Sequence, residues 1–243
     1  SPEMDEYRRL VDVQIGHLKL GSGGPTDWYA TGSPTEVASK DYATLFIGGS
    51  NLMPRFTWLI SECRKHGFKR VVEFGSVDGI SLFPLMMNAK DIEWHGVEVS
   101  KAAVLHGRKV AEELGMEKFH LHQADSFAAF SKERDGRRIG PFDAAAVFEV
   151  LEHNDPDECH EILYAAEDSV RPGGRIYIST PCGNWSAHDE STRVFPLKKD
   201  HVNAFTEKRM RAFLKDKKDV FCEVIENTNF EEGNSNVHAS YER

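Results

Sequence analysis

The sequence predicts an α/β protein built on an open, mostly parallel β-sheet. Short runs of β-branched and aromatic residues alternate with segments of helical periodicity from about residue 51 to the end of the chain. One of these runs is followed by a glycine turn, and the next run ends near an acidic residue. Strands and helices that alternate at this spacing imply a parallel sheet with helices on both faces.

The glycine turn contains Gly75 and Gly79, and it follows a short strand predicted at residues 71–74 in KRVVEFGSVDGISLFPLMM. Glycine adopts positive φ and has no Cβ, so backbone N–H groups and a helix N-terminus approach a ligand closely. Val77 stands where a dinucleotide-binding G-x-G-x-x-G has its second glycine. The pattern therefore disfavours a pyrophosphate-binding loop and a nicotinamide-dependent oxidoreductase.

Glu98 lies near the end of a second strand, predicted at residues 94–99, about two dozen residues after the glycine turn. Nucleotide-binding α/β folds place a carboxylate there to accept hydrogen bonds from ribose hydroxyls. A carboxylate that closes an apolar strand is costly to bury unless a partner satisfies it. The turn and this carboxylate together predict a nucleoside-containing ligand.

The remaining elements follow in regular alternation. We expect helices at residues 51–66, 81–87, 101–114, 126–134, 157–170 and 206–214. We expect strands at residues 119–123, 142–148, 175–179, 220–225 and 237–241, the last one antiparallel to its predecessor. Residues 1–54 form an extension of one helix and a Gly/Pro-rich loop, in which Trp28 and Tyr29 either belong to a lid or pin the loop to the surface.

Composition narrows the class of protein and its partners. A chain of 243 residues suits one α/β domain with an appendage, and its net charge of −9 disfavours nucleic acid as a partner. Four cysteines without a C-x-x-C pair predict a reducing, cytoplasmic compartment, and no run approaches the length of a membrane span. Because the chain lacks a start methionine and stops after its last strand, we expect one domain of a larger protein.

Five segments in order resemble the class I S-adenosylmethionine (SAM) dependent methyltransferases: VVEFGSVDG, GVEVS, QADSF, FDAAAVFEVLEH and SVRPGGRIYISTP. The resemblance runs from about residue 55 to the C-terminus. It implies a Rossmann-like fold with a seven-stranded, mostly parallel sheet, SAM as cofactor, and methyl transfer as the reaction. Many members have a small residue at Val77, so this side chain should narrow the floor of the methionine pocket without blocking it.

The resemblance also implies which residues bind the cofactor at the carboxyl ends of the strands. The expected set is Glu73, Gly75, Ser76 and Gly79 for the methionine half, Glu98 and Val99 for the ribose side, Asp125 and Ser126 for the adenine edge, and Phe148. Two of these have structural alternatives. Glu73 would then only orient the glycine turn, and Asp125 would only cap the helix that follows.

The loop at residues 149–153, EVLEH, contains the residues expected to lie near the methyl acceptor. In similar small-molecule O-methyltransferases the histidine lies near the methyl acceptor, where a neutral imidazole takes a hydroxyl proton. In small-RNA terminal 2′-O-methyltransferases a similar E-x-x-E-H joins a later histidine to bind a divalent metal, and His201 is the matching residue here. A structural alternative makes Glu152 and His153 caps of the helix that starts near Asp157.

We therefore expect methylation of an oxygen atom of a small molecule or glycan, with His153, His201 and Glu149 as catalytic residues. One alternative is Mg²⁺-dependent 2′-O-methylation of RNA or a sugar diol through Glu149, Glu152, His153 and His201. Another is a SAM-binding scaffold without catalysis. Residues 181–200 form a long connection, so Trp185 and His188 are expected to shape the acceptor pocket.

Overall fold

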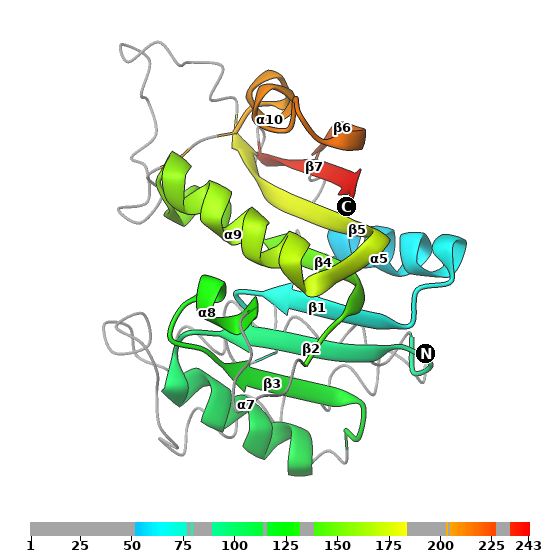
Figure 1. Ribbon diagram of the computed structural model, residues 1–243, viewed down its shortest axis with the longest axis vertical. Coiled ribbons are helices and arrows are strands. Elements are labelled where there is room, and N and C mark those ends of the chain that lie inside the picture. Colours follow the sequence, from blue (N-terminus) through cyan, green and yellow to red (C-terminus); the bar gives the residue numbers. More distant parts are fainter. Residues whose placement is uncertain are drawn as a thin grey trace. The chain divides into compact units, whose positions relative to one another are not determined.

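The protein has a seven-stranded sheet in the order β3-β2-β1-β4-β5-β7-β6 (Figure 1). The structure is a computed structural model, and it describes residues 52–76, 79, 89–113, 116–131, 139–183, 203, 205–226 and 234–243. The chain divides into two compact units, Ser1–Ser126 and Phe127–Arg243. The helix expected at residues 81–87, and the extension at residues 1–54 up to residue 51, lie outside the described residues.

The described part of the first unit contains three parallel strands and two helices. They are α5 (Leu52–His66), β1 (Arg70–Phe74), β2 (Glu93–Glu98), α7 (Lys101–Glu113) and β3 (Phe119–Gln123). β2 pairs in parallel with β1 on one side and with β3 on the other. β1 carries a run of apolar residues, whereas β2 and β3 alternate apolar with polar residues. Phe74 and Trp94 are completely buried in this core.

The second unit contains the remaining four strands. Its elements are α8 (Phe127–Ser131), β4 (Phe142–Phe148), the 3₁₀ turn η2 (Leu151–His153), α9 (Pro156–Ser169), β5 (Val170–Gly183), α10 (Glu207–Phe213), β6 (Lys218–Glu226) and β7 (Asn234–Glu242). β4 pairs in parallel with β5, and β7 is antiparallel to both β5 and β6. The expected antiparallel last strand is confirmed. Within the described part of the chain, no helix is long and apolar enough to cross a membrane.

Strand β5 is much longer than the strand expected at residues 175–179. The sequence RPGG resembles a turn, yet β5 begins before it, because Val170 already pairs with Phe142 of β4. The register then shifts, and Gly173 has a φ of 76°. A Cβ on Gly174 would lie 2.4 Å from the carbonyl oxygen of Asp143. Glycines thus let the strand continue through a bulge that local propensity alone marks as an end.

Asp155 caps helix α9. Its Oδ1 accepts hydrogen bonds from the N–H groups of Asp157 and Glu158, each at 2.9 Å. The Glu158 carboxylate accepts in return from the N–H of Asp155 at 3.0 Å, which completes a capping box. The alternative that made Glu152 and His153 the caps is therefore wrong, and both residues belong to η2 instead.

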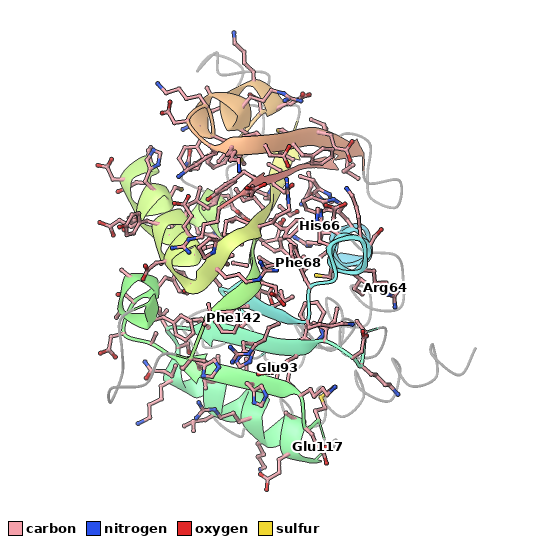
Figure 2. All side chains as sticks on the ribbon, turned by 45° about the vertical axis from the view of Figure 1, so that its right-hand side comes forward. Arg64, His66, Phe68, Glu93, Glu117 and Phe142 are labelled. Atoms are coloured by element: carbon pink, nitrogen blue, oxygen red, sulfur yellow. The ribbon has the colours of Figure 1, made fainter. Side chains whose placement is uncertain are left out.

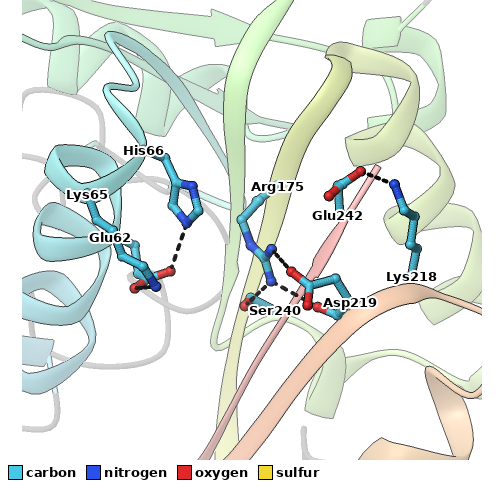
Figure 3. A network of polar contacts seen from close by, with 8 residues as sticks. All are labelled: Glu62, Lys65, His66, Arg175, Lys218, Asp219, Ser240 and Glu242. Atoms are coloured by element: carbon cyan, nitrogen blue, oxygen red, sulfur yellow. Dashed lines mark hydrogen bonds and ion pairs between the residues drawn. The ribbon is translucent and has the colours of Figure 1, made fainter.

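A buried arginine joins the three C-terminal strands of the sheet (Figure 3). Nη2 of Arg175 on β5 donates to the carbonyl oxygen of Asp219 at 3.0 Å and to Oγ of Ser240 on β7 at 3.1 Å. The carboxylate of Asp219 on β6 pairs with Nη1 of the same guanidinium. Because several donors of this buried cation find acceptors, the arginine fixes the relative register of these strands.

Candidate functional site

The glycine turn after β1 adopts the expected backbone. Gly75 has a φ of 80° and Gly79 a φ of 82°, which residues with a Cβ rarely adopt. The N–H groups of Gly75 and Ser76 both donate to the carbonyl oxygen of Val97, at 2.9 and 3.2 Å. The N–H of Gly79 donates to the carbonyl oxygen of Ser76 at 2.8 Å. The turn is therefore fastened to the end of β2.

Gly96 on β2 allows the turn to lie against the sheet. A Cβ at Gly96 would stand 2.5 Å from Oγ of Ser76 and 2.7 Å from Cδ2 of Leu121. The Ser76 side chain is buried, and its Oγ has no hydrogen-bond partner among the described residues. Sequence reasoning did not identify Gly96, although a glycine inside a strand is a signal of close backbone approach.

Glu98 ends β2 with its carboxylate held in place. The residue is 8% exposed, and Oε1 accepts from the N–H groups of Val99 at 2.8 Å and Ser100 at 2.9 Å. Ser100 Oγ in turn accepts from the N–H of Ala103 in the first turn of α7, at 3.3 Å. These contacts satisfy the buried charge in part and fix its orientation. A carboxylate accepts several hydrogen bonds at once.

The ends of β2 and β3 are joined side by side. The N–H of Ala124 donates to the carbonyl oxygen of Glu98 at 3.0 Å, and Gln123 Nε2 donates to the carbonyl oxygen of Val99 at 3.5 Å. Asp125 and Ser126 follow on the surface. The structure thus brings the candidate residues of the first unit to the carboxyl ends of three adjacent strands: Glu73, Gly75, Ser76, Gly79, Glu98, Val99, Asp125 and Ser126. Val77 lies outside the described residues.

In the second unit, Glu149 follows the buried Phe148 in a strained backbone conformation. Its φ is 55°, a region that non-glycine residues enter at a cost and that is common at functional sites. Its N–H donates to the carbonyl oxygen of Ser179 at 2.8 Å, and Oε1 accepts from Nδ2 of Asn236 at 2.7 Å. Two other strands therefore hold both the backbone and the carboxylate of Glu149.

Glu152 and His153 form a pair of a buried carboxylate and a partly exposed imidazole. Glu152 is 2% exposed, and its Oε2 accepts from Oγ1 of Thr180 at 3.0 Å. Its Oε1 lies 3.7 Å from Nε2 of His153, whose side chain is 37% exposed. Sequence reasoning missed Thr180 and Asn236, because both reach this loop from strands far along the chain.

His201 lies outside the described residues, but a near neighbour in sequence contacts the same loop. The N–H of Asn203 donates to the carbonyl oxygen of Glu152 at 3.0 Å, and its Nδ2 lies 3.3 Å from Sγ of Cys159. Burial raises the pKa of the Cys159 thiol to about 11, so this thiol packs rather than reacts. Trp28, Tyr29, Trp185 and His188 also lie outside the described residues.

The contacts of Glu149, Glu152 and His153 test the expected metal site only in part, because His201 lies outside the described residues. Among the described residues, Glu149, Glu152 and His153 do not form a compact group of ligand atoms; such a group occurs elsewhere, at Glu93, His95 and His120. The Glu149 carboxylate instead contacts Asn236. A metal bound with the help of His201 remains a prediction.

The sheet order, with its antiparallel β7, the glycine turn after β1 and the carboxylate that ends β2 define a class I SAM-dependent methyltransferase fold. The sequence agrees, because a family model described as a methyltransferase domain matches residues 52–225. The chain therefore belongs to this family of methyltransferase domains.

Solved structures of several methyltransferases share the fold. The methyltransferase domain of bacterial CtHen1 superposes with a TM-score of 0.59 at 20% identity, over 79% of this chain and 100% of that one. An O-methyltransferase family protein from Burkholderia thailandensis gives 0.61 at 14% identity, over 99% and 71%. The SAM-dependent methyltransferase SibL gives 0.61 at 16% identity, over 99% and 73%. None of the curated proteins compared with the sequence matches it.

Proposed function

We propose that this SAM-dependent methyltransferase methylates an oxygen atom of a small-molecule or glycan acceptor, with His153 as the general base. The observation that carries the proposal is the pair of His153 and Glu152, 3.7 Å apart, of which only the imidazole reaches solvent. A buried carboxylate beside an imidazole stabilises the imidazolium that forms when a hydroxyl proton is taken. The hydrogen bond from Thr180 keeps that carboxylate in position.

The residues of the first unit fit SAM. The positive φ of Gly75 and Gly79 opens the turn to a ligand, and the Glu98 carboxylate is oriented at the end of its strand. When bound, SAM supplies a sulfonium methyl group for in-line displacement. In the proposal Glu98 accepts hydrogen bonds from the ribose hydroxyls. The other proposed cofactor contacts are Glu73, Gly75, Ser76, Gly79, Val99, Asp125, Ser126 and Phe148.

Glu149 is proposed to orient the acceptor. Its strained backbone and its 2.7 Å contact with Asn236 hold the carboxylate at the end of β4. Alignment of the acceptor with the methyl group is the main task of such an enzyme, because an in-line displacement needs a near-attack geometry. The net charge of −9 favours a neutral or sugar-like acceptor over RNA.

A second candidate function is metal-dependent 2′-O-methylation of RNA or a sugar diol, through Glu149, Glu152, His153 and His201. It is favoured by Asn203, two residues after His201, whose N–H bonds to the carbonyl oxygen of Glu152. If this function holds, a chelator abolishes turnover and added Mg²⁺ restores it. Full turnover in excess chelator would exclude it and leave the histidine base mechanism.

The test of the base is His153→Ala. Turnover is measured as release of S-adenosylhomocysteine over a panel of phenolic and sugar hydroxyls, and binding of S-adenosylhomocysteine is measured separately. We expect kcat to fall by about 10²–10⁴-fold while cofactor affinity stays the same. The surface variant His160→Ala on α9 is the matched control. Unchanged turnover in His153→Ala would contradict the proposal, and a wild type without turnover on any acceptor would favour a scaffold.

A further inference from the structure

Strands β2 and β3 present four metal-competent side chains on one face of the sheet. Glu93 and His95 alternate on β2, and His120 and His122 alternate on β3. The parallel register places His95 directly opposite His120. Alternate residues of a strand point to the same face, so these side chains converge. Figure 2 shows Glu93 on the sheet of the first unit.

The ligand atoms lie at distances that bracket those around a tetrahedral metal ion. Nε2 of His95 is 2.6 Å and Nε2 of His120 is 3.9 Å from Oε1 of Glu93, and one ligand atom from each of the three residues lies within 4.8 Å of the others. Around an ion with bonds of about 2.0–2.1 Å, tetrahedral ligands stand roughly 3.4 Å apart. Side-chain rotations that move the ligand atoms by about 1 Å are enough to reach that spacing.

We propose that Glu93, His95 and His120 bind a divalent transition metal ion of the zinc class, at a site separate from the methyl-transfer residues. Two imidazoles and one carboxylate suit Zn²⁺ better than Mg²⁺ or Ca²⁺, which prefer oxygen ligands. The bound ion links β2 to β3. Glu93 begins β2 and Glu98 ends it, so the site lies about 16 Å along the strand from the cofactor carboxylate.

His122 helps to orient the imidazole ring of His95. Nδ1 of His95 lies 2.8 Å from Nε2 of His122, and the two rings stack with an interplanar angle of 9°. With Nε2 of His95 on a metal, Nδ1–H donates to His122, which fixes the tautomer of the ligand. This is the supporting contact that histidine ligands in metalloproteins usually have.

The exposure of the three ligands gives the ion a route to the site. His95 is 4% exposed, whereas the side chains of His120 and Glu93 are 41% and 37% exposed. The His120 side chain makes no hydrogen bond within the part of the chain that the structure describes, although its ring lies 4.7 Å from that of His95. An ion thus enters from solvent, and water completes its coordination.

Two arginines lie near the site, and their positive charges oppose the binding of a cation. Nε of Arg70 lies 3.2 Å from Oε1 of Glu93, where it competes with a cation for the carboxylate. Arg108 on α7 donates to the carbonyl oxygen of Leu121, next to His122 in sequence. We expect Arg70→Gln to bind the ion several-fold more tightly.

The experiment is a calorimetric titration of Zn²⁺ into the chelator-treated, tag-free protein at pH 7, with Co²⁺ as a spectroscopic probe. We expect one ion per chain, a visible Co²⁺ absorption typical of mixed nitrogen and oxygen ligands, and a rise in Tm of about 5 °C at saturation. His120→Ala and Glu93→Gln should each weaken Zn²⁺ binding at least tenfold. His120→Ala changes a half-exposed side chain, so the variant is expected to fold. The circular dichroism spectrum of the variant verifies this.

The matched control is His66→Ala. His66 on α5 is paired with Glu62 at 3.5 Å (Figure 3), and it belongs to no cluster of potential metal ligands among the described residues. Zn²⁺ affinity should be unchanged in this variant. No Zn²⁺ binding to the wild type, or equal affinity in wild type, His120→Ala and Glu93→Gln, would overturn the proposal and leave these side chains as a polar network.

Discussion

Oγ1 of Thr180 donates a 3.0 Å hydrogen bond to Oε2 of Glu152, and both side chains are buried. Thr180→Val keeps the shape of the side chain and removes the donor. A buried carboxylate that loses a hydrogen bond is destabilised, so the free energy of unfolding should fall by about 1–3 kcal/mol. Urea unfolding measures this change.

The same pair allows a matched control. Glu152→Gln removes the charge but keeps an acceptor oxygen, so Thr180→Val in that background should cost less than in the wild type. The difference between the two costs is the contribution of the charge to this hydrogen bond. Equal costs in both backgrounds would show that the charge does not strengthen the hydrogen bond.

The strained backbone of Glu149 predicts different stabilities for two similar variants. Its φ is 55°. Glu149→Ala and Glu149→Gly both remove the carboxylate that Asn236 holds, but only glycine adopts this φ without strain. The glycine variant should be more stable than the alanine variant by about 1 kcal/mol, as measured by urea unfolding. Both should lose turnover to a similar degree, and a more stable alanine variant would contradict the account.

Stability should fall between pH 7 and pH 5 because of two buried histidines. Burial is the main cause that lowers the pKa of His95 to about 4 and of His122 to about 3. The positive charges of His95, His120, Arg108 and Arg70 lower the pKa of His122 further. At His95, His120 and Arg70 lower the pKa further, whereas Glu93 opposes the shift.

The sign follows from proton binding. The unfolded histidines, with pKa values near 6.5, bind more protons than the folded ones. Stability is therefore complete above about pH 6.5, and it falls by about 2 kcal/mol per histidine on going to pH 5. Urea unfolding in the presence of a chelator tests this, and His122→Gln should flatten the profile. A profile with the wild-type slope in that variant would disprove the assignment, and His160→Gln is the surface control.

The elements predicted correctly are those in which the local residue pattern favours the same structure as the pairing within the sheet. The strands at residues 119–123 and 142–148 are confirmed with the same bounds, and α5 begins one residue later than expected. Strand β5 was predicted too short, because RPGG has the composition of a turn while its pairing with β4 and β7 is a property of the whole sheet. Local propensity contains no information about such pairing.

The candidate site was predictable only in part, for a related reason. Glu98 and the glycines are recognisable because each directly ends or follows a strand that the local sequence predicts. The partners Thr180 and Asn236 are far from EVLEH in sequence, so nothing local marks them. Sequence reasoning did not single out Glu93, His95, His120 and His122, because their convergence depends on the register of β2 against β3.

The measurement that tests the central claim most directly is calorimetric titration of S-adenosylhomocysteine into the wild type and into Glu98→Ala. We expect micromolar binding to the wild type and at least tenfold weaker binding to the variant, because a charged hydrogen-bond acceptor is lost. Glu112→Ala, an exposed carboxylate on α7, is the control and should bind as the wild type does. Absence of binding to the wild type, or equal affinity in Glu98→Ala, would contradict the assignment of the cofactor site.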